Sequence, residues 1–292
     1  MTFRTAMELG RVSNLPTIWT NVLAAVALSG HPLSFSLVAV LAGAYSLFYV
    51  GGMYLNDAFD AEWDQRNKPE RPIPSGEVSE RTVYILGILM LAGGVLALTW
   101  VAINQGVLHV TLSMMPGVVL ALTIVFYDAF HKAHIFAPFL MGLIRGLVYI
   151  TVGMVLTGDK WYSLFGIYPA AALTLYVAGL TVVARQETLA SVRGSWSLLF
   201  LATPLLFALP QTIFSFFGWL MMFAYIFWMV YSVQFLRNGP AFDIPTSVMS
   251  LIAGISLVDS LFLVKAGYGH WFGACIACFL LTVLLQRIVR GT

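Results

Sequence analysis

The residues best suited to chemistry lie in one short polar segment, residues 54–76, which has the densest charge in the chain. Asn56, Asp60 and Asp64 recur at intervals of four, so a continuous helix would place all three on one face. Asp57 lies three residues before Asp60 and shares part of that face. Carboxylate and amide oxygens are the ligands of hard divalent cations. We therefore predict that these four residues are ligands of Mg²⁺.

Basic residues follow these oxygen donors. Arg66, Lys68 and Arg71 suit phosphate oxygens, and Pro72 and Gly76 favour a loop after the helix. In proteins Mg²⁺ is usually held by one or two carboxylates together with substrate phosphates. Carboxylates followed by cations therefore favour a diphosphate-binding site. The alternative is a solvated polar loop between two membrane spans.

The composition is that of a membrane protein. The chain has 292 residues, 60% of them hydrophobic and only 10% charged, whereas a soluble protein carries roughly 25% charged residues. We predict an all-α, polytopic transmembrane bundle of nine to ten spans, forming a single domain over residues 1–292. Each span needs about 20 apolar residues, and Pro204 and Pro210 divide a run that is too long for one. The ten apolar segments lie near 13–29, 34–56, 81–103, 108–127, 136–157, 163–183, 196–209, 212–236, 246–265 and 270–288.

The positions of the basic residues predict an orientation. If ten spans are counted from a cytoplasmic amino terminus, only Lys160 and Lys265 of the 15 Lys and Arg residues fall outside, and Arg145 lies within a span. This asymmetry fits the excess of positive charge in cytoplasmic segments. We therefore expect both termini and the polar segment 54–76 on the cytoplasmic face of the cell's inner (plasma) membrane.

Further polar residues lie in or beside the spans. Asn14 and Asn21 are seven residues apart and share a helix face, where they form either a helix–helix hydrogen bond or a substrate contact. Arg145 is costly within a span, so it faces a cavity or a partner. It is a candidate phosphate contact, although pairing with Asp128 alone would also explain it. Asp259 is either functional or a protonated structural residue bonded to a neighbouring helix.

Two pairs of potential metal ligands have simpler interpretations. His131 and His134 are three residues apart at a membrane interface, where a polar loop is favoured over a metal site. Cys275 and Cys278 are spaced like a redox pair but lie in an apolar run, so we interpret them as small buried apolar residues. The sequence contains no nucleic-acid-binding signature.

The segment 54–76 also resembles a family motif. Asn56-Asp57-x-x-Asp60-x-x-x-Asp64, followed by Arg-Pro-Ile-Pro-Ser-Gly at 71–76, is similar to the first aspartate-rich motif of the UbiA superfamily of intramembrane prenyltransferases. Residues 11–21 resemble the first-span signature of that family. Family members commonly have nine spans, so the segment 270–288 would be an addition.

A second stretch, from Tyr127 to His134, resembles the family sequence Tyr-Ser-x-x-Leu-Lys-Arg after the fourth span. Lys132 falls on the family's diphosphate-binding lysine. Asp128 replaces a serine and lies four residues before Lys132, so the two side chains can pair. The resemblance implies that Tyr127 and Asp128 face the cavity.

The family's second motif, Asp-x-x-x-Asp, is degenerate here. Its two aspartates correspond to Ala184 and Thr188, which leaves Glu187 as the remaining acid. Arg185 and Arg193 are candidates to replace the charge of a second metal. The alternative is a merely basic cytoplasmic loop.

The resemblance implies a helical bundle whose central cavity opens to the cytoplasmic face. It also implies transfer of a prenyl group from an isoprenyl diphosphate to an aromatic or other lipophilic acceptor. The catalytic residues would be Asp60, Asp64 and Lys132, with Mg²⁺ as cofactor. The diphosphate contacts would be Arg66, Arg71, Lys132, Arg145 and Arg185, and the polar cavity residues Asn14, Asn21, Tyr127, Asp128 and Glu187. Because the second motif is degenerate, a non-catalytic protein that binds, transports or scaffolds isoprenoid lipids is the alternative.

Overall fold

A computed structural model of the chain describes residues 1–106, 110–132, 134–158, 164–185, 196–236 and 243–289. Within these ranges the regular structure is helical, with no strand. Two short 3₁₀ turns, Val12–Asn14 and Gly269–Trp271, accompany the α-helices. The α-helices are α1 (Phe3–Leu9), α2 (Leu15–Leu28), α3 (Phe35–Phe59), α4 (Ala61–Asn67), α5 (Glu80–Asn104), α6 (Val110–Phe130), α7 (Ala137–Thr157), α8 (Leu164–Ala184), α9 (Trp196–Phe200), α10 (Thr203–Thr212), α11 (Phe216–Gln234), α12 (Ile244–Lys265) and α13 (Phe272–Leu285).

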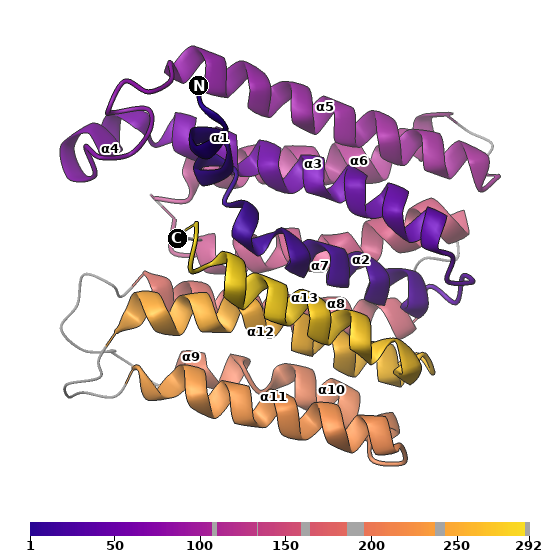
Figure 1. Cartoon of the computed structure of the whole chain (residues 1–292). Coiled ribbons are helices and arrows are strands. Elements are labelled where there is room, and N and C mark those ends of the chain that lie inside the picture. Colours follow the sequence, from indigo (N-terminus) through magenta and orange to yellow (C-terminus); the bar gives the residue numbers. More distant parts are fainter. Residues whose placement is uncertain (107–109, 133, 159–163, 186–195, 237–242, 290–292) are drawn as a thin grey trace.

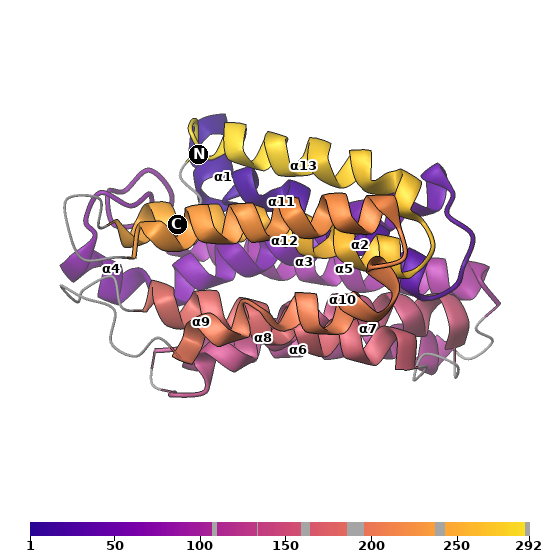
Figure 2. The ribbon, with the colours of Figure 1, turned by 90° about the horizontal axis from the view of Figure 1, so that it is seen from below.

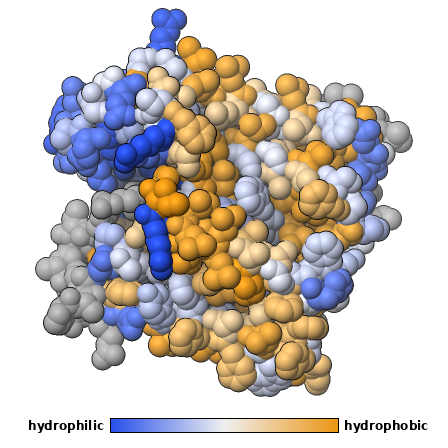
Figure 3. Space-filling model, in the orientation of Figure 1, coloured by the Kyte–Doolittle hydropathy of each residue, from blue (hydrophilic) through white to orange (hydrophobic). Residues whose placement is uncertain are grey.

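The described helices confirm the predicted multi-pass membrane fold. Seven of them are long and apolar enough to cross a bilayer, namely α3, α5, α6, α7, α8, α11 and α12. Three shorter apolar stretches, Val12–Leu28, Leu198–Leu209 and Gly269–Leu285, match the remaining predicted segments. Large apolar side chains cover much of the face shown in Figure 3, as expected for a surface in contact with lipid.

Local sequence signals explain where several spans begin. The side chains of Ser34 and Ser79 accept hydrogen bonds from the first turns of α3 and α5, and Asp243 does so for α12. In the long run 196–236 the chain breaks at residues 201–202, and Pro204 lies in the first turn of α10. Proline fits a first turn because its missing N–H has no partner there in any case.

The spans lie side by side along one common direction (Figures 1 and 2). Helix α12 is the most enclosed span, since 89% of its apolar window is buried inside the protein. It packs against α2, α8, α10, α11 and α13. Helices α7 and α8 approach closely because Gly142 and Gly146 face Thr174 of α8, where an added methyl group would overlap the Thr174 carbonyl or hydroxyl oxygen.

One end of the bundle gathers the polar parts of the chain. Helices α1 and α4 and the carboxyl end of α13 lie together at this end (Figure 1). Gln286, just after α13, donates from Nε2 to Asn14 Oδ1 over 3.0 Å. The described chain therefore begins and ends at the same end of the bundle, as an even number of crossings requires.

Candidate active site

The four predicted oxygen donors lie at a junction between two helices. Helix α3 ends at Phe59 and α4 begins at Ala61, with Asp60 between them. The Asp60 N–H still donates to the Asn56 carbonyl at 3.0 Å, and the Asp64 N–H to the Asp60 carbonyl at 2.8 Å. The helical spacing of Asn56, Asp60 and Asp64 therefore continues across the junction.

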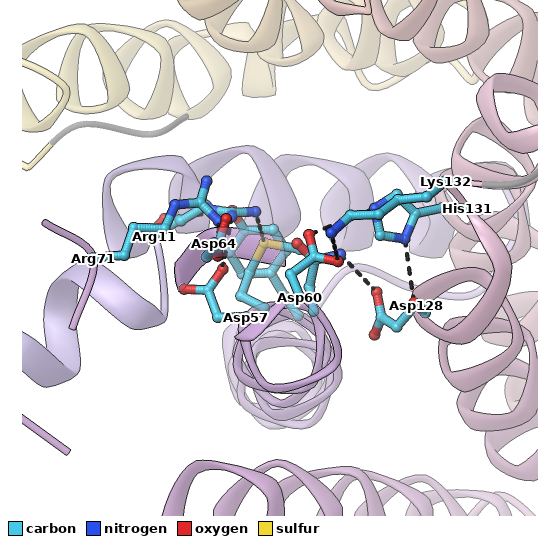
Figure 4. A network of polar contacts seen from close by, with 11 residues as sticks. Arg11, Asp57, Asp60, Asp64, Arg71, Asp128, His131 and Lys132 are labelled. Atoms are coloured by element: carbon cyan, nitrogen blue, oxygen red, sulfur yellow. Dashed lines mark hydrogen bonds and ion pairs between the residues drawn. The ribbon is translucent and has the colours of Figure 1, made fainter. Parts of the chain in front are cut away.

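Cations from three separate segments pair with these acids (Figure 4). Arg71 Nη1 lies 2.7 Å from Asp64 Oδ2 and 3.5 Å from Asp57 Oδ1. Arg11 Nη2 lies 3.0 Å from Asp57 Oδ1. Lys132 Nζ, from the segment after α6, lies 2.6 Å from Asp60 Oδ1. We call the residues Arg11, Asn56, Asp57, Asp60, Asp64, Arg71, Asp128, His131 and Lys132 the polar cluster.

Arg11 enters the polar cluster from an unusual backbone conformation. Its φ of 41° is the single positive φ of a non-glycine residue among those described, and its side chain is 18% exposed. Burial is the largest single effect and lowers the pKa of Arg11, but the electrostatic effects of Asp57, Tyr49, Tyr127 and Asp128 together outweigh it, so the pKa lies above its usual value. Arg11 therefore remains a cation at the edge of the polar cluster.

Lys132 and His131 connect the end of α6 to α4. Lys132 Nζ also lies over the ring of Trp63, 4.5 Å from its centroid. His131 Nε2 is 3.6 Å from Asp60 Oδ2, and the imidazole stacks on Tyr127. In the described residues no three His, Cys, Asp or Glu side chains converge as a metal site.

The polar cluster retains unused acceptors. Asn56 Nδ2 donates to Asp128 Oδ1 over 3.2 Å, but Asp128 Oδ2 and Asp64 Oδ1 are buried without a hydrogen-bond partner. A buried oxygen without a partner is costly. Each of these two carboxylates therefore keeps one oxygen that a further ligand could contact.

An apolar pocket opens beside the polar cluster. Asp128 belongs to both, and Met53, which also lines the pocket, lies with its Sδ 3.1 Å from Arg11 Nη1 of the polar cluster. The pocket lies between α2, α3, α6 and α7, and it is lined by Ile18, Tyr45, Phe48, Tyr49, Gly52, Met53, Leu120, Ile124, Tyr127, Asp128, Met141, Ile144, Arg145 and Val148. The arrangement joins a charged opening to an apolar interior.

Arg145 lines this pocket without pairing with Asp128. Its Nη1 donates to Asn21 Oδ1 at 2.7 Å and its Nη2 to Thr17 Oγ1 at 2.9 Å. Pairing with Asp128 therefore does not explain Arg145. Asn21 makes the helix–helix hydrogen bonds that were one of its two predicted roles, and Asn14 accepts from Gln286.

A model of the UbiA prenyltransferase family matches residues 13–243. The chain belongs to this family. It is 40% identical to the digeranylgeranylglyceryl phosphate synthase of Ignicoccus hospitalis over 92 aligned residues. This alignment covers 31% of this chain and 29% of that protein. It is 26% identical over 185 residues to the synthase of the same name from Saccharolobus solfataricus, covering 63% and 61%. The chain thus spans less than two thirds of either relative.

A solved structure supports the same fold. A structure reported for digeranylgeranylglyceryl phosphate synthase in membranes aligns with a TM-score of 0.50 and 19% identity, and covers 98% of this chain and 94% of that chain. The match of the family model confirms the resemblance to the UbiA family that was inferred from the sequence motifs.

Among the described residues, two predicted diphosphate contacts of this UbiA member, Arg66 and Arg185, form no ion pair with an acid of the polar cluster. Arg66 is exposed on α4 and pairs with Glu62 at 2.6 Å, one helical turn away. Arg185 follows α8, is exposed, and donates from Nη1 to the His134 carbonyl over 3.2 Å. The rest of the degenerate second motif, including Glu187, Thr188 and Arg193, lies outside the described residues.

Three polar-cluster contacts were not predicted from the sequence, namely those of Arg11, His131 and Trp63. Arg11 opens the first-span signature, so its place in that motif was the available signal. The partners Arg11 and Asp57 are 46 residues apart, and no local spacing connects them.

Proposed function

We propose that this UbiA family member is an intramembrane prenyltransferase that moves a prenyl group from an isoprenyl diphosphate to a lipophilic acceptor. One observation carries the proposal: a group of paired acids and cations borders an apolar pocket within the bundle. This arrangement suits a ligand with an anionic head and a long apolar chain. The family membership and the synthases among the relatives support the same reaction class.

The charge balance of the polar cluster supports the use of Mg²⁺. Its acids Asp57, Asp60 and Asp64 already pair with its three permanent cations, Arg11, Arg71 and Lys132. These pairs leave no net positive charge for an anionic diphosphate, so a further positive charge that enters with it would favour its binding. The oxygens of Asn56, Asp60 and Asp64 would hold Mg²⁺, which, when bound, neutralises charge on the leaving diphosphate.

The side chains of the chain supply the other requirements. Arg71, Arg11 and Lys132 are donors that can turn from carboxylates to phosphate oxygens and stabilise the charge that develops as the C–O bond breaks. The apolar walls of the pocket would shield the allylic carbon from water, so that the acceptor rather than water is prenylated. Arg185, next to Ala184 where the family's second motif has an aspartate, would add a fixed cation.

The orientation belongs to the same proposal. Cations gather at the end of the bundle that carries the polar cluster, and positive charge favours the cytoplasmic side. We place the polar cluster at the cytoplasmic face of the inner (plasma) membrane, where soluble diphosphates and Mg²⁺ are available.

Purified protein in detergent tests the reaction. Radiolabelled farnesyl or geranylgeranyl diphosphate is supplied with a lipid extract or with a glyceryl phosphate carrying one geranylgeranyl group, an acceptor suggested by the names of the relatives. We expect labelled lipid product with Mg²⁺, none with a chelator, and a loss of at least tenfold in Asp60→Asn and Asp64→Asn. Tight binding of the diphosphate without product from any acceptor would instead indicate an isoprenoid-binding protein.

A further inference from the structure

A second polar network lies inside the bundle, away from the polar cluster. Asp259 of α12 is fully buried. It accepts from Asn21 Nδ2 at 2.8 Å on each carboxylate oxygen, from Thr20 Oγ1 at 2.6 Å, and from the Tyr149 hydroxyl. Three helices, α2, α7 and α12, thus meet on one carboxylate. Such a charge within a span is costly and is kept for a specific role.

The side-chain amide of Asn21 lies between the Asp259 carboxylate and the Arg145 guanidinium and bonds to both. Because its NH₂ group faces Asp259, its carbonyl oxygen faces the other way and accepts from Arg145 Nη1 at 2.7 Å. Thr17 Oγ1 accepts from Nη2 at 2.9 Å. The guanidinium therefore has a fixed orientation, with its carbon 5.8 Å from the centroid of the Tyr49 ring.

The separation between the two charges is the informative feature. Among the described residues no carboxylate lies within salt-bridge distance of Arg145. A direct Arg–Asp pair would occupy the donors of the guanidinium in a two-bond fork. With one amide between them, Asp259 balances the charge of Arg145 from a distance, and a positive field still faces the pocket that Arg145 lines.

Arg145 lies deeper in the bundle than the polar cluster, so its positive charge acts on the interior part of the pocket. It lies eight residues into α7, roughly 12 Å along the helix from Ala137. Side chains on a helix lean toward its amino terminus, which for α7 is the end that carries the polar cluster. Arg145 thus reaches from within the pocket toward its charged opening, where Asp128 is also part of the lining.

We propose that Asp259 is a positioning residue that holds Arg145, through Asn21, as a further cationic contact for the anionic head of the ligand whose chain fills the pocket. The inference rests on the proposed function, because it assumes a prenyl diphosphate in this pocket. Helix α12 lies beyond residues 13–243 that match the family model.

The test measures the affinity of full-length protein in detergent for geranylgeranyl thiodiphosphate, by calorimetry with Mg²⁺ present. Asp259→Asn places an NH₂ group against that of Asn21 and should turn the amide away from Arg145, weakening binding about tenfold. Arg145→Met should weaken it at least as much. The double variant should bind no worse than Arg145→Met, because both changes remove the same contact.

Ser260→Ala is the matched control. Ser260 is equally buried on α12, and its observed hydrogen bond is to the Leu257 carbonyl of its own helix. The affinity of Ser260→Ala for the probe should stay within twofold of the wild type.

An exchange variant separates positioning from a purely structural role. Asn21→Asp combined with Asp259→Asn keeps the net charge and the hydrogen-bonding groups but brings the carboxylate directly onto Arg145. We expect the exchange variant to melt closer to the wild-type temperature than Asp259→Asn does. Its affinity for geranylgeranyl thiodiphosphate should remain about tenfold below that of the wild type. Affinity equal to the wild type in the exchange variant or in Asp259→Asn, or losses that multiply in the double variant, would overturn the inference. A wild-type protein that does not bind the probe would overturn the proposed function as well.

Discussion

Arg11 combines a strained backbone with a role in the polar cluster. A left-handed conformation costs an L-residue roughly 1–2 kcal/mol, and at Arg11 the φ is 41°. The ion pair with Asp57 at 3.0 Å is the observed contact that this conformation permits. Strained residues that persist in this way gather at functional sites.

Two substitutions at Arg11 separate the backbone from the charge. Arg11→Gly and Arg11→Ala both remove the cation, so both should weaken binding of geranylgeranyl thiodiphosphate by about tenfold. Glycine adopts a positive φ without a steric penalty. Arg11→Gly should therefore unfold at a higher temperature than Arg11→Ala, by the equivalent of about 0.5–1 kcal/mol. Equal melting temperatures would show that the backbone relaxes once the ion pair is lost.

Arg71 and Arg66 form a second matched pair. Both arginines pair with an acid of the same polar segment, but Arg71 contacts Asp64 and Asp57 within the polar cluster while Arg66 lies exposed against Glu62. Arg71→Ala should weaken diphosphate binding at least tenfold, about 1.4 kcal/mol. Arg66→Ala should change it less than twofold, because exposed ion pairs one turn apart contribute about 0.3–0.5 kcal/mol. Calorimetry measures the diphosphate affinity of both variants. Similar losses of affinity would show that Arg66 also contacts the ligand.

At the scale of elements, α7 presents two different faces. Gly142 and Gly146 allow the close approach of α8, while Arg145 faces the pocket. The small residues and the cation are thus coupled, because the distance between α7 and α8 also sets where Arg145 lies. In membranes, small residues at helix contacts give the close packing that stabilises a bundle.

Enlarging either glycine should disturb both faces. Gly142→Ala and Gly146→Ala place a methyl group against Thr174 or Ala170, and overpacking typically costs about 1–3 kcal/mol. We expect a lower melting temperature in detergent and weaker diphosphate binding. Gly43→Ala is the control, since nothing lies within 4 Å of a methyl group there; it should not destabilise the protein. An unchanged melting temperature for Gly146→Ala would mean that α7 and α8 lie further apart than described.

The whole molecule is polarised along its length. Helices α1 and α4 and the carboxyl end of α13 share one end, while α5 ends at the other (Figure 1). The polar cluster and the exposed Arg66 and Arg185 occur at the first end. Such an uneven distribution of charge gives the bundle a defined orientation in the membrane.

Reporter fusions test this orientation. A reporter enzyme that works only in the cytoplasm should be active when fused after Thr292. A reporter that works only outside should be active when fused after Gln105, because α5 ends on the opposite side. Activity of the outside reporter after Thr292, in a well-expressed fusion, would contradict the ten-segment topology.

The sequence alone determined the features that depend on local spacing. Apolar segments of span length predicted the helices, because each helix satisfies its own backbone hydrogen bonds in lipid. The recurrence of Asn56, Asp60 and Asp64 predicted one helix face, which persists across the α3–α4 junction because the backbone bonds between these residues continue. The motif also predicted the family, since its residue types and spacing are contiguous in the chain.

Tertiary structure alone decided which partners the charged side chains have. Asp60 pairs with Lys132, which is distant in sequence, and Asp57 with Arg11. Arg145 bonds to Asn21 rather than to Asp128, and Asn21 in turn to Asp259, 238 residues away. The contacts among Arg145, Asn21 and Asp259 depend on how α2, α7 and α12 pack against each other. Helix periodicity fixes only which face a side chain occupies, so the partner across that face is set by the packing of the whole bundle.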